Sequence, residues 1–133
     1  MKMVFADTFY YIALLSPNDA AHRRAVEFTR DYNELMVTTA WIVTELADGM
    51  AGVSTRQAFA HFHEAIRVDP QVSIVQPEQD CFDEGLQLYR ARIDKEWSLT
   101  DCISFVVMQH QGITEALTGD HNFEQAGFKA LLR

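Results

Sequence analysis

The sequence predicts an α/β fold of three layers, α/β/α, with a central parallel sheet of four to five short strands. Short apolar segments alternate along the chain with longer segments whose apolar residues recur at helical spacing. This alternation favours parallel strands joined by right-handed crossovers, with helices covering both faces of the sheet. The 133 residues are 48% hydrophobic and contain no repeat, low-complexity tract or Pro/Gly-rich linker. We therefore expect a single domain over residues 1–133.

The strands are expected where a short apolar segment is bounded by polar or turn-forming residues. In chain order these segments are residues 2–6, 35–38, 72–75, 115–118 and, as a possible fifth strand, 128–132. The first segment ends at Asp7-Thr8 and the fourth ends at Gly119-Asp120. Because ligands gather at the carboxyl ends of parallel strands, these two turns mark the expected functional edge of the sheet.

The helices are expected where apolar residues at helical spacing lie between a capping residue and a stop signal. In chain order they are residues 9–15, 18–32, 40–50, 54–67, 78–94 and 98–110, with Asn18, Thr39, Ser54 and Ser98 as N-caps. Ser98 and Asp101 have the spacing of a capping box, and Gly112 ends the last helix. Residues 102–108 are apolar or small all round, which predicts a buried central helix whose N-terminus points at the sheet edge.

Composition and charge limit the possible functions. The chain carries 11 Lys and Arg against 19 Asp and Glu, a net charge of −8, which argues against a nucleic-acid binder unless carboxylates hold divalent cations. No segment is long and apolar enough to span a bilayer, and no secretory signal precedes Asp7, so a cytoplasmic protein is expected. Cys81 and Cys102 predict neither a disulfide framework nor a zinc site.

Four acidic residues stand out because their expected positions are unusual for surface groups. Asp7 and Asp120 directly follow the first and fourth strands, and Asp101 lies in the first turn of the apolar helix. Glu45 has apolar neighbours along its own helix, where an unpaired carboxylate costs several kcal/mol. Three of the four are therefore expected at one edge of one sheet.

Each of these acids also has a purely structural explanation. Asp7 fits an N-cap, Asp101 fits a plain capping box, and Asp120 fits an ordinary turn. Glu45 is suited to an ion pair with an arginine. Asp48, one turn from Glu45, is an alternative candidate for the functional acid of that helix.

With these residues in place, the chain resembles the PIN-domain family, and within it the VapC-type toxins of toxin–antitoxin pairs. The resemblance covers essentially the whole chain, and the segment around Thr118 and Phe123 is its most specific part. The matching segments are Val4-Phe5-Ala6-Asp7-Thr8, Val43-Thr44-Glu45, Leu99-Thr100-Asp101-Cys102 and Leu117-Thr118-Gly119-Asp120-His121-Asn122-Phe123. The resemblance implies a PIN-like three-layer fold and a metal-dependent endoribonuclease that inhibits translation.

The resemblance also implies roles for individual residues. Asp7 and Asp101 are the expected direct ligands of Mg²⁺ or Mn²⁺, and Glu45 and Asp120 complete the metal site directly or through water. Thr8 and Thr118 are expected to position carboxylates or a substrate phosphate. Hard divalent cations prefer oxygen ligands, which suits an all-carboxylate set. Four ionised carboxylates carry a formal charge of −4, which two divalent cations cancel.

The partners implied by the resemblance are an RNA substrate, a small cognate antitoxin and a second copy of the chain. The apolar segments 9–15 and 40–50 are the expected interface elements. Two groups of basic residues are candidates for contact with an RNA backbone, although solvated helix faces are their default interpretation. The first group is Arg90, Arg92 and Lys95, and the second is Arg23, Arg24 and Arg30.

Other acid-rich α/β folds fit less well. A response-regulator receiver needs paired acids after its first strand, and a haloacid-dehalogenase-type phosphatase needs Asp-x-Asp there, whereas this chain has Asp7-Thr8-Phe9. Two alternatives remain within the resemblance: a stand-alone housekeeping nuclease, and a catalytically silent binding or assembly module. All four expected acids are present, which favours the enzyme.

Overall fold

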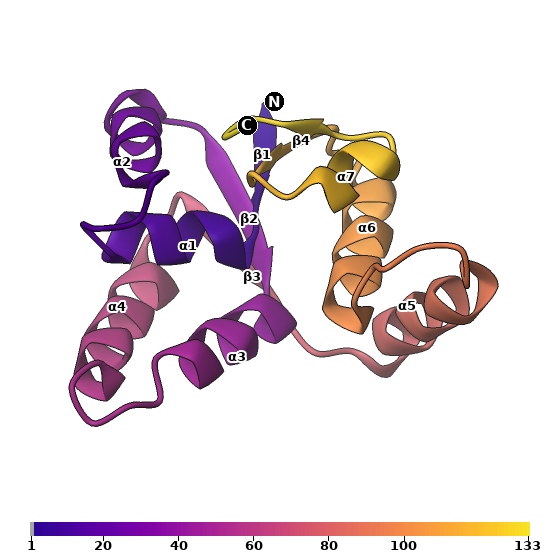
Figure 1. Ribbon diagram of the computed structural model, residues 1–133, viewed down its shortest axis with the longest axis horizontal. Coiled ribbons are helices and arrows are strands. Elements are labelled where there is room, and N and C mark those ends of the chain that lie inside the picture. Colours follow the sequence, from indigo (N-terminus) through magenta and orange to yellow (C-terminus); the bar gives the residue numbers. More distant parts are fainter. Residues whose placement is uncertain (1) are drawn as a thin grey trace.

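The computed structural model describes residues 2–133, which form a five-stranded parallel sheet flanked by seven helices (Figure 1). The strand order is β3-β2-β1-β4-β5, and every neighbouring pair is parallel. The strands are β1 (Met3–Ala6), β2 (Leu35–Thr39), β3 (Val72–Val75), β4 (Glu115–Leu117) and β5 (Lys129–Ala130). The predicted three-layer α/β/α fold and its parallel sheet are confirmed.

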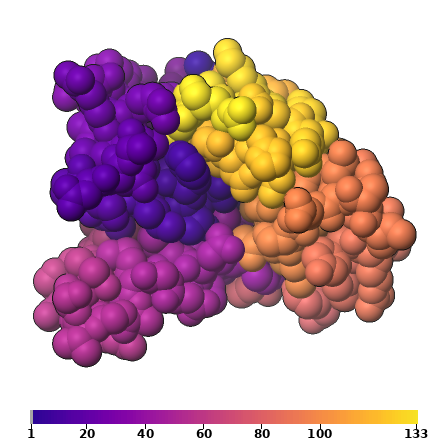
Figure 2. All heavy atoms as spheres, in the orientation of Figure 1, coloured from indigo at the N-terminus to yellow at the C-terminus, as the bar shows by residue number. Residues whose placement is uncertain are grey.

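The helices form two groups, one on each side of the sheet. Their bounds are α1 (Thr8–Leu15), α2 (His22–Asp31), α3 (Ala40–Gly49), α4 (Arg56–Val68), α5 (Gln79–Ala91), α6 (Leu99–Gln111) and α7 (His121–Gln125). In Figure 1, α1 to α4 lie on one side of β1 and α5 to α7 lie on the other. The space-filling view shows the two groups meeting near the centre of this face (Figure 2). Covered from both sides, Val4, Phe5 and Ala6 of β1 are fully buried.

Helix α6 is the central helix that its composition predicts. All seven residues from Cys102 to Met108 are buried. The capping box forms, since the Ser98 hydroxyl accepts a hydrogen bond from the Asp101 N–H and the Asp101 carboxylate accepts one from the Ser98 N–H. Gly112 ends the helix in the left-handed conformation, at φ 66°. These local signals fix where the N-terminus of α6 lies.

Four local expectations differ from the structure. Helix α5 ends at Ala91 rather than at Asp94. Helix α2 begins at His22 rather than at Asn18, because the Asp19 carboxylate accepts a hydrogen bond from the Ala21 N–H and holds a turn there. Helix α4 begins at Arg56, and Ser54 does not cap it. Helix α7 was not expected, because its five residues are too few to show helical periodicity.

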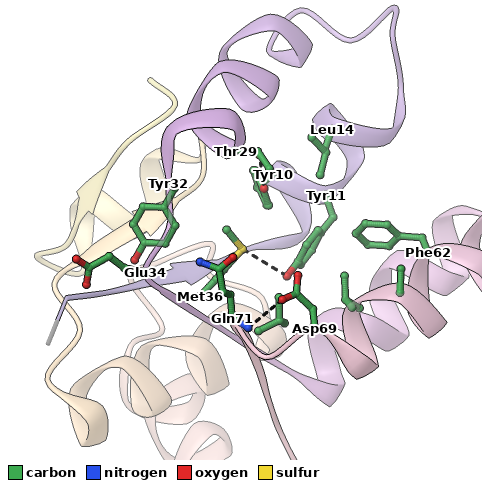
Figure 3. A pocket seen from close by; sticks show the side chains of 13 residues that line it. Tyr10, Tyr11, Leu14, Thr29, Tyr32, Glu34, Met36, Phe62, Asp69 and Gln71 are labelled. Atoms are coloured by element: carbon green, nitrogen blue, oxygen red, sulfur yellow. Dashed lines mark hydrogen bonds between the residues drawn. The ribbon is translucent and has the colours of Figure 1, made fainter.

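A partly open cavity of about 280 Å³ lies at the amino-terminal edge of the sheet, between α1, α2, α4 and the starts of β2 and β3. Figure 3 shows the side chains of Tyr10, Tyr11 and Phe62 around it. The Tyr32 hydroxyl donates to the Leu35 carbonyl at 2.8 Å, and the Tyr10 hydroxyl bonds Thr29. This wall is therefore largely aromatic, and the hydroxyls of Tyr10 and Tyr32 are satisfied within the protein.

No helix in residues 2–133 is long and apolar enough to cross a membrane.

Candidate functional site

The four acids singled out from the sequence line one cleft at the carboxyl edge of the sheet. Its volume is about 690 Å³, and Asp7, Glu45, Asp101 and Asp120 all contribute to its wall. Asp7 follows β1, Glu45 lies on α3, Asp101 lies in the first turn of α6, and Asp120 caps α7 after β4. In Figure 2 the segments that carry them come together near the centre of the face. Four separate parts of the chain therefore supply carboxylates to one space.

Asp7 is the most buried of these acids, with 6% of its surface exposed. Although it occupies the N-cap position of α1, its side chain makes no capping hydrogen bond. Instead the Thr118 hydroxyl donates to its Oδ2 at 2.8 Å. Burial raises the pKa of Asp7 from 3.8 to about 7; the nearby charges of Asp101 and Glu45 add to this, and the Thr118 hydrogen bond opposes it. Capping therefore does not explain Asp7.

Asp101 serves the capping box and faces the cleft at the same time. Its Oδ2 accepts hydrogen bonds from the Ser98 N–H and from Nδ2 of Asn122, each at 3.1 Å. Burial raises its pKa, the charges of Asp120 and Glu45 add to this, and the two hydrogen bonds oppose it. The structural role and the candidate functional role therefore coexist in this residue.

Asp120 is held between the end of β4 and the start of α7. Its Oδ1 accepts a hydrogen bond from the Asn122 N–H at 2.9 Å, which caps α7. Its own N–H donates to the Thr118 hydroxyl at 3.0 Å, and that hydroxyl in turn holds Asp7. Thr118 thereby links two of the acids, as its expected supporting role requires.

Asn122 is a cleft residue that sequence reasoning did not assign to the site. Its side chain reaches Asp101 and its backbone N–H reaches Asp120, so it joins the two acids across the cleft. The available signal was its place two residues after Asp120, within the most specific segment of the family resemblance. Glu96 and Ser98 also line the cleft.

Glu45 lies in a different environment from the one its sequence neighbours suggest. It is exposed at the cleft, whereas Ile42 and Leu46 on the same helix are buried, so the expectation of an apolar surrounding is wrong. Within residues 2–133 it has no ion-pair partner, and the Thr8 hydroxyl donates a hydrogen bond to its Oε1. Asp48 is exposed and does not line the cleft, which removes it as the alternative helix acid.

Gly119 explains how the turn after β4 fits against α1. A Cβ atom at Gly119 would lie 2.4 Å from Cζ of Phe9, so only glycine leaves room for this ring. Phe9 is itself part of the cleft wall. The glycine thereby allows Asp120 and the start of α1 to border the same space.

The donor set fits a hard divalent cation, because it consists of carboxylate oxygens with hydroxyls beside them. In residues 2–133, however, no three carboxylate, imidazole or thiol groups stand close enough together to surround one ion as they are oriented. All four carboxylates are turned toward hydrogen-bond donors, which belong to Thr8, Thr118 and Asn122. Shared coordination of one ion would therefore require some of these side chains to rotate.

Comparison with known protein families identifies the fold. The PIN domain family matches residues 4–129. The chain belongs to the PIN domain family. The resemblance to this family, which the four acidic segments of the sequence indicate, is thereby confirmed.

The relatives include a ribosomal RNA endonuclease. The chain is 28% identical over 129 residues to the 23S rRNA-specific endonuclease VapC20 of Mycobacterium tuberculosis, covering 95% of each chain. The crystal structure of that protein, described as a sarcin–ricin loop cleaving toxin, matches with a TM-score of 0.86 at 25% identity over 94% of this chain and 95% of the other.

Two further solved structures share the fold at lower identity. FitAcB from Neisseria gonorrhoeae matches with a TM-score of 0.69 at 20% identity, over 96% of this chain and 95% of the other. VapBC2 from Rickettsia felis, solved with a DNA fragment from its promoter, matches with a TM-score of 0.69 at 9% identity, over 96% of each chain. At these identities the likeness concerns the fold alone.

Proposed function

We propose that the chain is a divalent-metal-dependent endoribonuclease and the toxin of a toxin–antitoxin pair, which acts by hydrolysing phosphodiester bonds of RNA and so inhibits translation. The observation that carries the proposal is the lining of one cleft by Asp7, Glu45, Asp101 and Asp120 in a PIN domain. Similarity along nearly the whole chain to a 23S rRNA-specific endonuclease supports RNA as the substrate class.

The chemistry follows from the donor set. Mg²⁺ or Mn²⁺, when bound, supplies Lewis-acid polarisation of the phosphoryl oxygens and makes an attacking water more acidic. Asp7 and Asp101, the two acids with burial-raised pKa values, are the proposed direct ligands. Glu45 and Asp120 would complete the metal site, directly or through water, and would orient the attacking water. Neutralisation of the carboxylates by cations allows an anionic phosphate to enter a cleft of an acidic protein.

The supporting residues hold the carboxylates in place. Thr118 donates to Asp7 and accepts from the Asp120 N–H, and Thr8 donates to Glu45. Asn122 donates to Asp101. Each donor stabilises the ionised form of its carboxylate and so opposes the rise in pKa that burial causes at Asp7 and Asp101.

A small antitoxin and a second copy of the chain are the proposed protein partners. The chain shares its fold with VapBC2, which was solved bound to a DNA fragment from its promoter. This shared fold is consistent with an antitoxin partner. Helices α1 and α3 remain the proposed self-association elements, and Ile12 of α1 is 39% exposed. Sedimentation that shows a monomer at micromolar concentration would count against self-association.

Cleavage-site mapping tests the function most broadly. Total RNA is incubated with the purified chain and Mg²⁺, and new 5′ ends are mapped by sequencing. The proposal predicts discrete new ends, with 23S rRNA as the first molecule to inspect, and their loss in the Asp7→Asn variant. Equal cleavage by both proteins would contradict the assigned site, and no cleavage of any RNA by the wild-type chain would contradict the nuclease.

A further inference from the structure

A second surface cavity adjoins the acidic cleft. It has a volume of about 650 Å³ and is formed by the end of α5 and the loop that leads to α6, residues 89–99. Glu96 and Ser98 line both this cavity and the acidic cleft, so the two spaces share one wall. We call the surface formed by Tyr89, Arg92, Ile93 and Lys95 the α5–α6 shelf. A strand of RNA that leaves the cleft on this side meets the shelf first.

The shelf carries a large aliphatic side chain and an aromatic side chain that are both exposed to solvent. Ile93 is 91% exposed and Tyr89 is 48% exposed, whereas most large hydrophobic side chains of the protein are buried. An exposed aromatic ring beside a nucleic-acid path offers a stacking platform for an unpaired base. RNA is read in this way mainly in loops and bulges, whose bases are free to stack on protein side chains.

The shelf is also a basic part of an acidic protein. Arg90, Arg92 and Lys95 lie in residues 89–99 against two acids, Asp94 and Glu96, a local charge of +1 in a chain of net charge −8. The charged side chains that line the cleft are all carboxylates, so cationic contacts to the flanking phosphates have to come from elsewhere.

Two of these cations are held in distinct ways. The Arg92 guanidinium makes two hydrogen bonds of 3.0 Å to Asp94 and lies 5.0 Å from the ring centre of Trp97. Arg92 is therefore fixed against the loop. The Lys95 ammonium lies 4.0 Å from the Asp94 carboxylate, at the limit of an ion pair. The Lys95 charge is therefore less tightly paired than that of Arg92, and its side chain is 26% exposed against 41% for Arg92.

We propose that the α5–α6 shelf binds the RNA segment that flanks the scissile phosphate, with Tyr89 stacking on an unpaired base and Lys95 contacting the backbone. The proposal rests on the nuclease function and names the substrate contacts that the acidic cleft lacks. Charge complementarity and the wall shared with the cleft both favour RNA as the occupant of the shelf. Lys95 and Tyr89 bind RNA in this proposal and take no part in catalysis, because both lie outside the cluster of carboxylates.

RNA binding is measured separately from cleavage, in the Asp7→Asn background with Mg²⁺. The ligand is a fluorescein-labelled RNA hairpin that carries the sarcin–ricin loop, and the readout is fluorescence anisotropy over a range of salt concentrations. Tyr89→Ala is expected to raise the Kd about tenfold, as the loss of one stacking contact does. Lys95→Gln is expected to reduce the slope of log K against log salt by about 0.7, the value of one phosphate contact on a single strand.

The matched control is Arg56→Gln on α4, which removes an exposed charge that lines neither the cleft nor the shelf cavity. It is expected to leave both the Kd and the salt slope near those of the Asp7→Asn parent. Equal Kd values and salt slopes for the shelf variants, the control and the parent would overturn the proposal, and so would a parent that binds no RNA. Cleavage by the wild-type chain, assayed in parallel, reports on the nuclease function independently of this result.

Discussion

The two edges of the sheet are built in opposite ways. At the carboxyl edge, four carboxylates from separate segments line an open cleft, and their partners are hydroxyl, amide and backbone donors. At the amino-terminal edge, Tyr10, Tyr11 and Phe62 line a smaller cavity whose hydroxyl groups are satisfied internally. The two regions share α1, since its first residues face the cleft and Tyr10 and Tyr11 face the cavity.

This difference separates function from stability. Carboxylates brought close together without cationic partners oppose folding, because burial and mutual repulsion disfavour their charged forms. Packed aromatic rings favour folding through buried area and ring contacts. Substitutions at the cleft should therefore change activity and spare stability, and substitutions at the cavity should do the reverse.

The largest expected effect is on catalysis. Asp7→Asn and Asp101→Asn should each lower the rate of RNA cleavage by about 100-fold or more, because each removes a carboxylate that we propose as a metal ligand. The rate is measured under single-turnover conditions with Mg²⁺, and folding is checked by circular dichroism. Tyr11→Phe, which keeps the ring and removes only the hydroxyl, is the control and should cleave like the wild type. If both cleft variants cleave at the wild-type rate, the cleft is not the active site.

At the other edge, the expected loss is in stability. Tyr11 is 2% exposed and packs edge-on against Phe62, with ring centroids 5.4 Å apart. Tyr11→Ala should lower the free energy of unfolding by about 3–5 kcal/mol, the usual cost of truncating a buried aromatic residue. Urea unfolding measures this change. A loss below about 1 kcal/mol would show that the cavity wall contributes little to the fold.

The pH dependence of stability tests the buried carboxylate at the carboxyl edge of the sheet without altering how side chains pack at the other edge. Burial raises the pKa of Asp7 from the ordinary value of 3.8 to about 7 in the folded protein, so the folded state holds its proton more tightly than the unfolded chain does. This contribution to the free energy of unfolding is fully present below pH 3.8 and is lost as pH rises toward 7. The loss is at most about 1.4 kcal/mol for each unit of pH.

We therefore expect metal-free wild type, kept in EDTA, to lose more stability between pH 5 and pH 8 than Asp7→Asn does. Chemical unfolding at both pH values gives the two differences directly. Addition of Mg²⁺ at pH 8 should restore stability to the wild type, because the bound cation favours the ionised carboxylates. Parallel stability curves for the two proteins would contradict the burial of an uncompensated Asp7.

A smaller effect is expected where the cleft wall meets α1. Gly119→Ala would place a methyl group against the Phe9 ring, which must move within the cleft wall. Cleavage should fall about tenfold through misplacement of neighbouring groups, and stability should fall by about 1 kcal/mol. Gly49→Ala, at the last residue of α3 on the same cleft wall, is the matched control, because its added Cβ meets nothing within 4 Å and it should not lower stability. Equal behaviour of the two variants would contradict the tight contact at Gly119.

The sequence predicts those parts of the fold that have a local signal. The capping box of Ser98 and Asp101 forms as expected, and the positions of Asp7 and Asp120 after β1 and β4 place both at the cleft. The parallel sheet follows from the alternation of short strands and helices, and the order of its strands comes from tertiary packing.

Other features depend on contacts that no local pattern contains. The Asp19 side chain holds a turn that delays the start of α2, so Asn18 is not a cap. Glu45 follows apolar residues along its helix, yet its direction is set by how α3 docks beside α1, and it faces the open cleft. The tyrosine-lined cavity joins residues from α1, α2 and α4, which only the assembled fold brings together.

The central claim, that the cleft carboxylates act together on a divalent cation, is tested most directly by calorimetric titration with Mn²⁺. Four proteins are compared: the wild type, Asp7→Asn, Asp101→Asn, and the control Asp48→Asn, whose carboxyl lies on α3 outside the cleft. Saturable binding by the wild type and the control, weakened about tenfold or more in both cleft variants, is the predicted result. Absence of Mn²⁺ binding by the wild type, or equal affinity in all four proteins, would contradict the claim.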